Sequence, residues 1–308
     1  MTDIVVPDEL RRTVLRWFGE EGERWLAAVP GEAERLRDRW RLRLGAPYTG
    51  GSNALVLTAA TEDGQPAVLK IPIRDEENVH EAAALRAYAG DGAVRLLTYE
   101  EQTGAMLLER ADPGTPLSAW GDLFAAIDIA ASVMRRLRRP APEGVPLARV
   151  VDVAGRWAQT LSGLDLPGHS RLVDEAVRLA SAYAAAPVGP DLLINRDAHL
   201  DNILRAGRQR WLLIDPKPMI GEAAFEAGHP VLNAMRHRPP ETMRPDYVDR
   251  LVIRWAMGLG ADPVRVRGWA LIRAVQNVQW ALEIDEDPAA DLAEAVALST
   301  GALSPHAS

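Results

Sequence analysis

The chain has 308 residues, of which 47% are apolar and 25% charged, with no cysteine and a formal net charge of -8. These values indicate a globular protein with a sizeable core, and they exclude disulfides, thiolate metal sites and a cysteine nucleophile. The negative charge argues against a nucleic-acid partner and is compatible with a cationic small substrate. The N-terminus does not resemble a signal peptide, and no apolar run reaches membrane-spanning length. We therefore expect a cytoplasmic protein without a membrane partner. The sequence leaves open whether it is a monomer or a dimer.

The first part of the chain predicts helices followed by two hairpins. Apolar residues at helical spacing over 8–44 indicate two or three short helices, broken near Pro30-Gly31. Two apolar, β-branched runs at 54–61 and 67–71 then flank the turn Glu62-Asp63-Gly64, as in a β-hairpin. A helical pattern over 76–89 precedes a second hairpin.

That second hairpin is expected from 94–99 and 105–110, around Gly104. After Asp112-Pro113-Gly114 the pattern is mainly helical, apart from one β-like island over 192–215. The expected helices are 117–138, 150–162, 170–186, 244–258, 264–284 and 288–299. This order predicts an α+β protein of two lobes, with a small mixed-sheet N-lobe at 1–110 and a larger, mainly helical C-lobe at 111–308.

The island contains the most informative polar residues. Asp197 is followed five positions later by Asn202 and an apolar pair, and the strand at 211–214 ends on Asp215. These three side chains are expected to meet at the mouth of one hairpin. Phosphoryl transfer needs such a set, because one carboxylate orients the attacking hydroxyl while an amide oxygen and a second carboxylate hold magnesium. The alternative is that all three merely cap turns.

Lysine is rare in this chain, since the basic residues are nearly all arginine and lysine occurs only at Lys70 and Lys217. Lys70 lies in an apolar strand, where a buried ammonium needs a partner. Glu81 in the following helix is the expected one, and such a pair can hold nucleotide phosphates. The alternative is that Lys70 extends from an edge strand to solvent.

A glycine-rich turn, Tyr48-Thr49-Gly50-Gly51-Ser52-Asn53, precedes the first hairpin. Its backbone amides can cradle phosphates, although a turn of this composition can also be only a turn. The chain lacks the P-loop lysine pattern, a full Rossmann glycine pattern and a nucleophile elbow with a plausible triad. Phosphate binding is therefore expected to depend on a kinase-like arrangement.

In this order the motifs resemble those of the aminoglycoside phosphotransferases, distant relatives of protein kinases, and especially the streptomycin 6-kinase and hydroxyurea-resistance kinase branch. The resemblance covers nearly the whole chain. Its matching segments are Trp25-Leu-Ala-Ala-Val-Pro30, Val68-Leu-Lys-Ile71, Glu81-Ala-Ala-Ala-Leu-Arg86, Val94-Arg-Leu-Leu97, Met106-Leu-Leu-Glu-Arg110, Asp197-x-His199-x-x-Asn202-Ile203-Leu204, Ile214-Asp215-Pro216-Lys217-Pro218, Ile220-Gly221-Glu222 and Gln276-Asn277-x-x-Trp280.

The resemblance implies a protein-kinase-like fold that uses ATP and Mg²⁺ to phosphorylate a hydroxyl of a small polar acceptor. Asp197 would be the catalytic base or orienting carboxylate, and Asn202 with Asp215 would bind magnesium. Nucleotide binding would involve Lys70, Glu81, the turn Gly50-Gly51-Ser52, and backbone groups of Glu109, Arg110 and Ala111 near the adenine.

Two residues depart from the family pattern. The position two before the catalytic aspartate usually holds histidine and here holds Asn195, and Glu226 follows Phe225 where aspartate is common. Asn can still donate and accept hydrogen bonds, so we expect a looser loop with its chemistry retained. The alternative is a pseudokinase-like nucleotide-binding protein. His199 is expected to be structural, because phosphoryl transfer needs little early proton abstraction.

The acceptor is expected to be cationic, with an aminocyclitol such as streptomycin as the leading candidate; an amino sugar or hydroxyurea is the alternative. Trp280 and Glu283 lie about one helical turn apart and share a face. The alternative is that the acidic stretch that contains Glu283 is only a solvent-exposed helix end. The candidate acceptor residues are Glu222, Trp280, Glu283 and Asp285, with Glu226 as a further carboxylate.

Overall fold

The computed structural model describes residues 4–51, 53–236 and 243–300. The chain divides into two compact units, residues 1–114 and 115–308. Ser52 of the glycine-rich turn lies outside the described residues. None of the helices in the described ranges is both long and apolar enough to cross a membrane.

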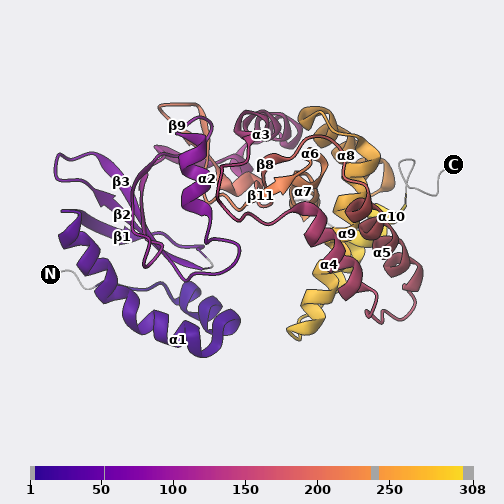
Figure 1. Cartoon of the computed structure of the whole chain (residues 1–308), viewed down its shortest axis with the longest axis horizontal. Helices are drawn as coiled ribbons and strands as arrows, with labels where there is room; N and C mark the ends of the chain where they lie inside the picture. The colour runs from indigo at the N-terminus through magenta and orange to yellow at the C-terminus, as the bar shows by residue number, and fades with distance from the viewer. Residues whose placement is uncertain (1–3, 52, 237–242, 301–308) are drawn as a thin grey trace. The chain divides into compact units, whose positions relative to one another are not determined.

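The first unit is a five-stranded antiparallel sheet in the order β1-β2-β3-β5-β4, with the helical segments α1 and α2. Figure 1 shows α1, α2 and the strands β1, β2 and β3 of this unit. Its elements are α1 (Asp8–Arg39), β1 (Arg43–Pro47), β2 (Ala54–Ala60), β3 (Pro66–Pro72), α2 (Glu81–Tyr88), β4 (Leu96–Tyr99) and β5 (Met106–Glu109). β2 and β3 form the expected hairpin, with Leu57 opposite Leu69. The second expected hairpin is also present, as the antiparallel pair β4 and β5.

The side chains of β3 alternate between the hydrophobic core on one face of the sheet and α2 on the other. Leu69 and Ile71 point into the hydrophobic core beneath α1, together with Leu55 and Leu57 of β2. Because successive side chains of a strand point to opposite faces, Lys70 points away from that core. There it meets α2, whose first residue is Glu81.

The N-terminal segment α1 consists of two helices that meet at a kink, in line with the expected two or three helices, but the expectation of a break near Pro30-Gly31 is wrong. α1 continues through Pro30 to Arg39, and its non-helical residue is Gly19, with φ 49° and ψ -126°. A proline inside a helix removes one backbone hydrogen bond and costs about 3 kcal/mol. Buried residues on both sides of Pro30, among them Leu26 and Leu36, pack into the core and offset that cost.

The second unit is mainly helical with two small sheets, β10-β9-β6 and β11-β8-β7. Its elements, with β6 at the boundary residues, are β6 (Pro113–Pro116), a 3₁₀ turn (Leu117–Ala119), α3 (Leu123–Leu137), β7 (Arg139–Pro140), α4 (Val150–Leu161), α5 (Ser170–Ala185), β8 (Leu192–Asn195), a 3₁₀ turn (Leu200–Asn202), β9 (Ile203–Ala206), β10 (Trp211–Leu213), β11 (Pro218–Gly221), α6 (Ala223–Glu226), α7 (Gly228–Arg236), α8 (Pro245–Leu259), α9 (Pro263–Glu283) and α10 (Ala289–Ser299).

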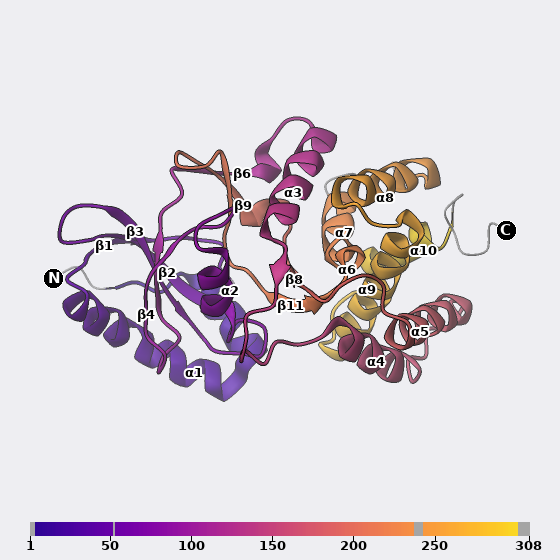
Figure 2. The ribbon, with the colours of Figure 1, turned by 45° about the horizontal axis from the view of Figure 1, so that its top comes forward.

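α9 is the central helix of this unit and contacts α4, α5, α6, α7, α8 and α10 (Figure 2). Its buried residues include Trp269, Ile272 and Val275. The expected helices at 150–162, 170–186, 244–258, 264–284 and 288–299 are present within one or two residues. The helix expected over 117–138 begins later, at Leu123, where Asp122 accepts backbone hydrogen bonds from Phe124 and Ala125.

Candidate functional site

In the first unit, Lys70 and Glu81 form a buried ion pair. Lys70 Nζ lies 2.8 Å from Glu81 Oε1 and 2.6 Å from Oε2. Their side chains are 8% and 0% exposed. Lys70 is thus a buried residue of β3, between β2 and β5, and not a residue of an edge strand. A buried ammonium on a rigid strand is a suitable fixed cation for phosphate groups.

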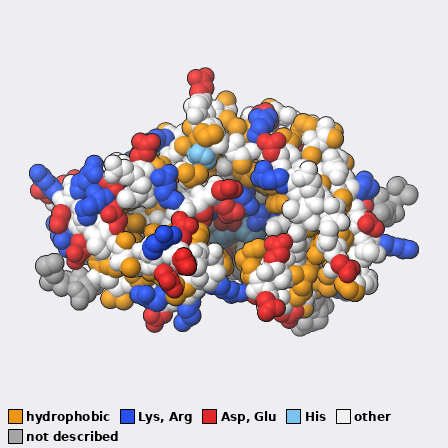
Figure 3. Space-filling model, turned by 60° about the horizontal axis from the view of Figure 1, so that its bottom comes forward, with side chains coloured by type: hydrophobic (Ala, Val, Ile, Leu, Met, Phe, Trp, Pro, Cys, Tyr) orange, Lys and Arg blue, Asp and Glu red, His pale blue; other side chains and the backbone are white. Residues whose placement is uncertain are grey.

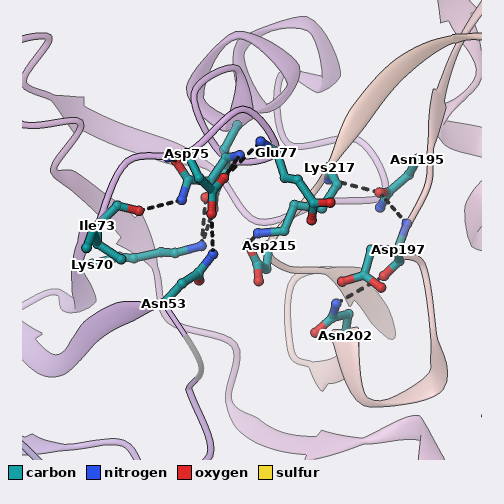
Figure 4. Close-up of polar contacts among 12 residues, drawn as sticks. Asn53, Lys70, Ile73, Asp75, Glu77, Asn195, Asp197, Asn202, Asp215 and Lys217 are labelled. Carbon is teal, nitrogen blue, oxygen red and sulfur yellow. Dashed lines mark hydrogen bonds and ion pairs between the residues drawn. The ribbon is translucent and has the colours of Figure 1, made fainter. Parts of the chain in front are cut away.

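The glycine-rich turn leads directly into β2. Gly50 has φ 86°, a conformation that side-chain-bearing residues rarely adopt, so this turn requires its glycine. After the turn, Asn53 Nδ2 donates to Asp75 Oδ2 at 3.1 Å, and Ile73 N donates to Asn53 O at 2.9 Å (Figure 4). These bonds fasten the end of the turn to the segment that follows β3.

The residues expected near adenine come at the end of β5. Glu109 N donates to Arg95 O at 2.9 Å, and Glu109 Oε2 accepts from Arg95 N at 3.0 Å. Arg110 and Ala111 follow this strand and are half-buried. The side chain of Glu109 is therefore engaged by the backbone of Arg95. In this segment it is the backbone of 109–111 that could form hydrogen bonds with the edge of a nucleotide base.

In the second unit, Asn195 joins the loop of Asp197 to the loop of Asp215. Asn195 Oδ1 accepts from Asp197 N at 3.1 Å and from Lys217 N at 2.9 Å (Figure 4). The side chain is 1% exposed, and two backbone donors on one atom identify that atom as the amide oxygen. Its Nδ2 has no hydrogen-bond partner within the described ranges. Asparagine thus supplies a buried acceptor beneath both loops.

Glu226 supports the same loop from α6. Its Oε1 accepts from Asn195 N at 3.0 Å, and its Oε2 accepts from Arg138 Nε at 2.8 Å. Burial raises the pKa of Glu226, against the opposing effects of Arg138 and the Asn195 N–H. The glutamate therefore has a local partner for each oxygen and holds the backbone that leads to Asp197.

Asp197 and Asn202 belong to one closed turn. Asn202 Nδ2 donates to Asp197 O at 3.0 Å, and Ile214 N donates to Asn202 O at 2.8 Å. Asp215 follows with φ 50°, and its Oδ1 accepts from Lys217 Nζ at 2.8 Å. The three residues expected from the sequence to lie at one hairpin mouth are thus linked through successive hydrogen bonds.

Two histidines flank the carboxylate of Asp197. His229 Nδ1 lies 2.6 Å from Oδ1, and His199 Nε2 lies 3.9 Å from Oδ2. Burial alone would raise the pKa of Asp197, but the hydrogen-bonding and charge effects of His229, with the charge effect of His199, bring it below its ordinary value. Asp197 is therefore a carboxylate at neutral pH. His229 was not among the residues predicted from the sequence, because it lies in none of the motifs named there.

The expected acceptor residues fall into two groups. Glu222 is buried and bonded to Arg265 and to Trp269 Nε1, the latter at 2.9 Å. The others lie at the end of α9, where Trp280 is 41% exposed and Glu283 accepts from Gln279 Nε2 at 2.9 Å. Asp285 follows the helix with φ 58° and is exposed. The structure therefore groups Trp280, Glu283 and Asp285, and places Glu222 in a separate, buried ion pair.

The chain matches the family model for aminoglycoside/hydroxyurea antibiotic resistance kinases over residues 39–285. It is 36% identical to a hydroxyurea phosphotransferase from Kitasatospora aureofaciens, with 92% of this chain and 82% of that protein covered. It is 35% identical to a streptomycin 6-kinase from Streptomyces glaucescens, with 93% and 95% covered.

Among solved structures, a choline/ethanolamine kinase family protein from Mesorhizobium loti superposes with a TM-score of 0.60 at 20% identity, covering 94% of this chain and 96% of that one. A thermostable mutant of aminoglycoside phosphotransferase APH(4)-Ia, in complex with ADP and hygromycin B, gives 0.59 at 16% identity, covering 87% and 98%. These confirm the expected protein-kinase-like α+β fold. The chain belongs to the aminoglycoside/hydroxyurea antibiotic resistance kinase family.

Proposed function

We propose that this protein transfers the γ-phosphoryl group of ATP to a hydroxyl of a small polar acceptor in the cytoplasm, with an aminocyclitol such as streptomycin as the leading acceptor. The observation that carries the proposal is the hydrogen-bonded assembly of Asp197, Asn202 and Asp215 around Asn195, in a chain of this kinase family. The same assembly supports an active enzyme over a pseudokinase, because Asn195 provides an acceptor for both loops.

The proposed reaction proceeds in line and without a covalent enzyme intermediate. The acceptor oxygen bonds to the γ-phosphorus as the bond from that phosphorus to the β,γ-bridging oxygen breaks, and ADP leaves. The hydroxyl proton passes to the carboxylate of Asp197 and then to solvent. Asp197 suits this task, since its lowered pKa keeps it ionised and able to accept the proton.

Magnesium binding is proposed for Asn202 and Asp215. Asn202 donates through Nδ2 to Asp197 O, so its amide oxygen is turned to the other side. One carboxylate and one amide oxygen fit the hard-oxygen preference of Mg²⁺, which usually completes its shell with waters and substrate phosphates. When bound, the ion would neutralise charge on the β- and γ-phosphates. Lys217 beside Asp215 would keep that carboxylate in place.

We assign phosphate binding to Lys70, held by Glu81, and to the backbone around Gly50 and Gly51. The backbone of 109–111 would contact the base. A relative of the same fold was solved with ADP and hygromycin B, which supports a nucleotide as the donor. The first unit would thus supply the nucleotide-binding residues, and the second the residues of the transfer step.

For the acceptor, the proposal uses the exposed group at the end of α9. Glu283 and Asp285 can pair with cationic groups, and guanidinium pairs bidentately with carboxylates. Arg273, whose side chain lines a pocket together with His229, and Glu283 lie on the same helix, about 15 Å apart along its axis. An acceptor that engages Glu283 while presenting a hydroxyl to Asp197 must therefore be extended, as an aminoglycoside is.

Hydroxyurea is the second candidate. The carboxylates of Glu222 and Glu226 are committed to Arg265 and Arg138, which removes two of the expected partners for a cationic ligand. Figure 3 shows acidic and basic side chains interspersed on one face of the molecule, so that face has no uniformly charged surface among the described residues. A small neutral acceptor such as hydroxyurea could bind next to Asp197 without contacts to the carboxylates at the end of α9.

The test is a phosphorylation screen with ATP and Mg²⁺ over streptomycin, other aminoglycosides, hydroxyurea and neutral sugars, with the product position mapped. We expect a phosphorylated hydroxyl on streptomycin. If only hydroxyurea is phosphorylated, hydroxyurea takes the place of streptomycin as the proposed acceptor, and the proposed transfer reaction still holds. Nucleotide binding without transfer to any member of the panel would overturn the proposed function.

A further inference from the structure

We propose that His229 is a positioning residue for Asp197, whose imidazole N–H holds one carboxylate oxygen and leaves the other to accept the hydrogen bond of the acceptor hydroxyl. This inference rests on the proposed function. It starts from the 2.6 Å contact between His229 Nδ1 and Asp197 Oδ1. An unprotonated Nδ1 and a carboxylate Oδ1 are both hydrogen-bond acceptors and would repel each other at this distance. We therefore place a proton on His229 Nδ1.

The other histidine makes its nearest polar contacts with Asp201. His199 Nδ1 accepts from Asp201 N at 3.3 Å and lies 3.4 Å from Asp201 Oδ2. Its Nε2 lies 3.9 Å from Asp197 Oδ2, beyond direct hydrogen-bonding distance. The two oxygens of Asp197 are therefore unequal: Oδ1 is in contact with His229, while His199 is too far from Oδ2 to bond it directly.

The position of His229 is fixed by tight packing. It is the second residue of α7, between Gly228 and Pro230. A Cβ on Gly228 would lie 3.3 Å from Trp269 O, so the start of α7 rests directly against the backbone of α9. In this ring orientation the N–H of His229 is not aligned on Oδ1, so the 2.6 Å approach is a close contact whose hydrogen-bond angle is not met. A side chain on such a rigid support can hold a carboxylate with little loss of entropy.

The charges around His229 favour its neutral form. Burial lowers the pKa of His229 and outweighs the raising effect of Asp197, and the charges of Arg273 on α9 and of His199 lower it further. Arg196 lines the same pocket as His229 and Arg273. At neutral pH the neutral ring donates to Asp197 without adding a full positive charge, so the carboxylate stays basic. Below the pKa of His229 an imidazolium forms, and Asp197 becomes a weaker proton acceptor.

Two variants separate positioning from packing. His229→Leu removes the donor, and we expect kcat to fall about tenfold or more with the KM for ATP unchanged within a few-fold. His229→Asn keeps a donor near the place of Nδ1, so it should restore kcat to within about threefold of the parent. It cannot be protonated, so the fall in kcat on the acid side of the pH profile should move to lower pH. His169→Asn, in the same unit at the start of α5, is the matched control and should match the parent.

A second measurement does not depend on turnover. The pKa of His229, followed by NMR of its ring protons, should lie below 6.5 and fall further in Asp197→Asn, because the lost carboxylate had raised it. Equal values in both proteins would overturn the inference, as would a Leu variant with parental kcat and pH profile. If the parent transfers no phosphate, the proposed function fails while the NMR result still decides the contact.

Discussion

The ammonium of Lys70 lies within 2.8 Å of both carboxylate oxygens of Glu81, and the pair is buried between β3 and α2. Breaking such a pair is costly, since it leaves one uncompensated charge in the interior. We expect Glu81→Gln to lower the free energy of unfolding by about 3–5 kcal/mol, measured by urea denaturation.

A double variant distinguishes phosphate binding from structural support. Lys70→Met with Glu81→Leu replaces both charges by apolar groups and should recover most of the lost stability. Its affinity for ATP, measured by titration, should nevertheless remain at least about tenfold below the parent. Parental ATP affinity in the stable double variant would show that Lys70 is only a packing residue.

The metal assignment predicts a specific loss at Asp215. Asp215→Ala removes the one charged ligand proposed for Mg²⁺, so Mg²⁺-dependent nucleotide binding should disappear in metal titrations at fixed ATP. Asp201→Ala is a suitable control, because Asp201 is an exposed carboxylate of the same loop region that binds Ser118. A Mg²⁺ titration of Asp215→Ala that coincides with the parent would place the metal elsewhere.

Asn195 provides a test of whether the natural protein is catalytically impaired. Histidine at this position has one acceptor nitrogen for the two backbone N–H groups that Asn195 Oδ1 now binds. We expect Asn195→His to lower the free energy of unfolding by about 1–3 kcal/mol, because one buried backbone N–H is left without an acceptor. The kcat of the variant should stay within about tenfold of the parent. A rise from undetectable to robust turnover would instead identify a pseudokinase.

The exposed end of α9 predicts how the acceptor binds. Glu283→Gln should raise the KM for streptomycin more than it lowers kcat, and added salt should weaken acceptor binding in the parent. Glu286→Gln, a few residues beyond Glu283 and exposed, is the control. An unchanged KM in Glu283→Gln, together with efficient turnover of hydroxyurea, would favour the small neutral acceptor.

The parts of the fold that the sequence predicts are those with a strong periodic signal. The hairpin of β2 and β3 and the helices α4, α5, α8 and α10 carry apolar residues at regular spacing, and one face of each of these helices is buried. The error at Pro30 has the opposite cause. Pro30 suggested a helix end, but residues on both sides of it are buried on the same helix face, so the helix continues through Pro30 and the kink lies at Gly19.

The segment after Asp215 was the hardest to predict. β11 and α6 have four residues each and α7 has nine, so these elements are too short for a repeated apolar pattern to identify them in the sequence. The sequence could predict that Asp197, Asn202 and Asp215 are linked in space, because their spacing is set within one hairpin. It could not identify His229, which reaches Asp197 only through the packing of α7 on α9.

The most direct test of the account is phosphate transfer by Asp197→Asn. In this variant an amide NH₂ group replaces one carboxylate oxygen. The side chain keeps its shape, but the uncharged amide cannot accept the proton of the hydroxyl. With labelled ATP, Mg²⁺ and the best acceptor of the parent, we predict that kcat falls by about 100-fold or more while ATP affinity stays within a few-fold. Near-parental kcat in a correctly folded Asp197→Asn would contradict the assignment of Asp197 as the residue that receives the proton.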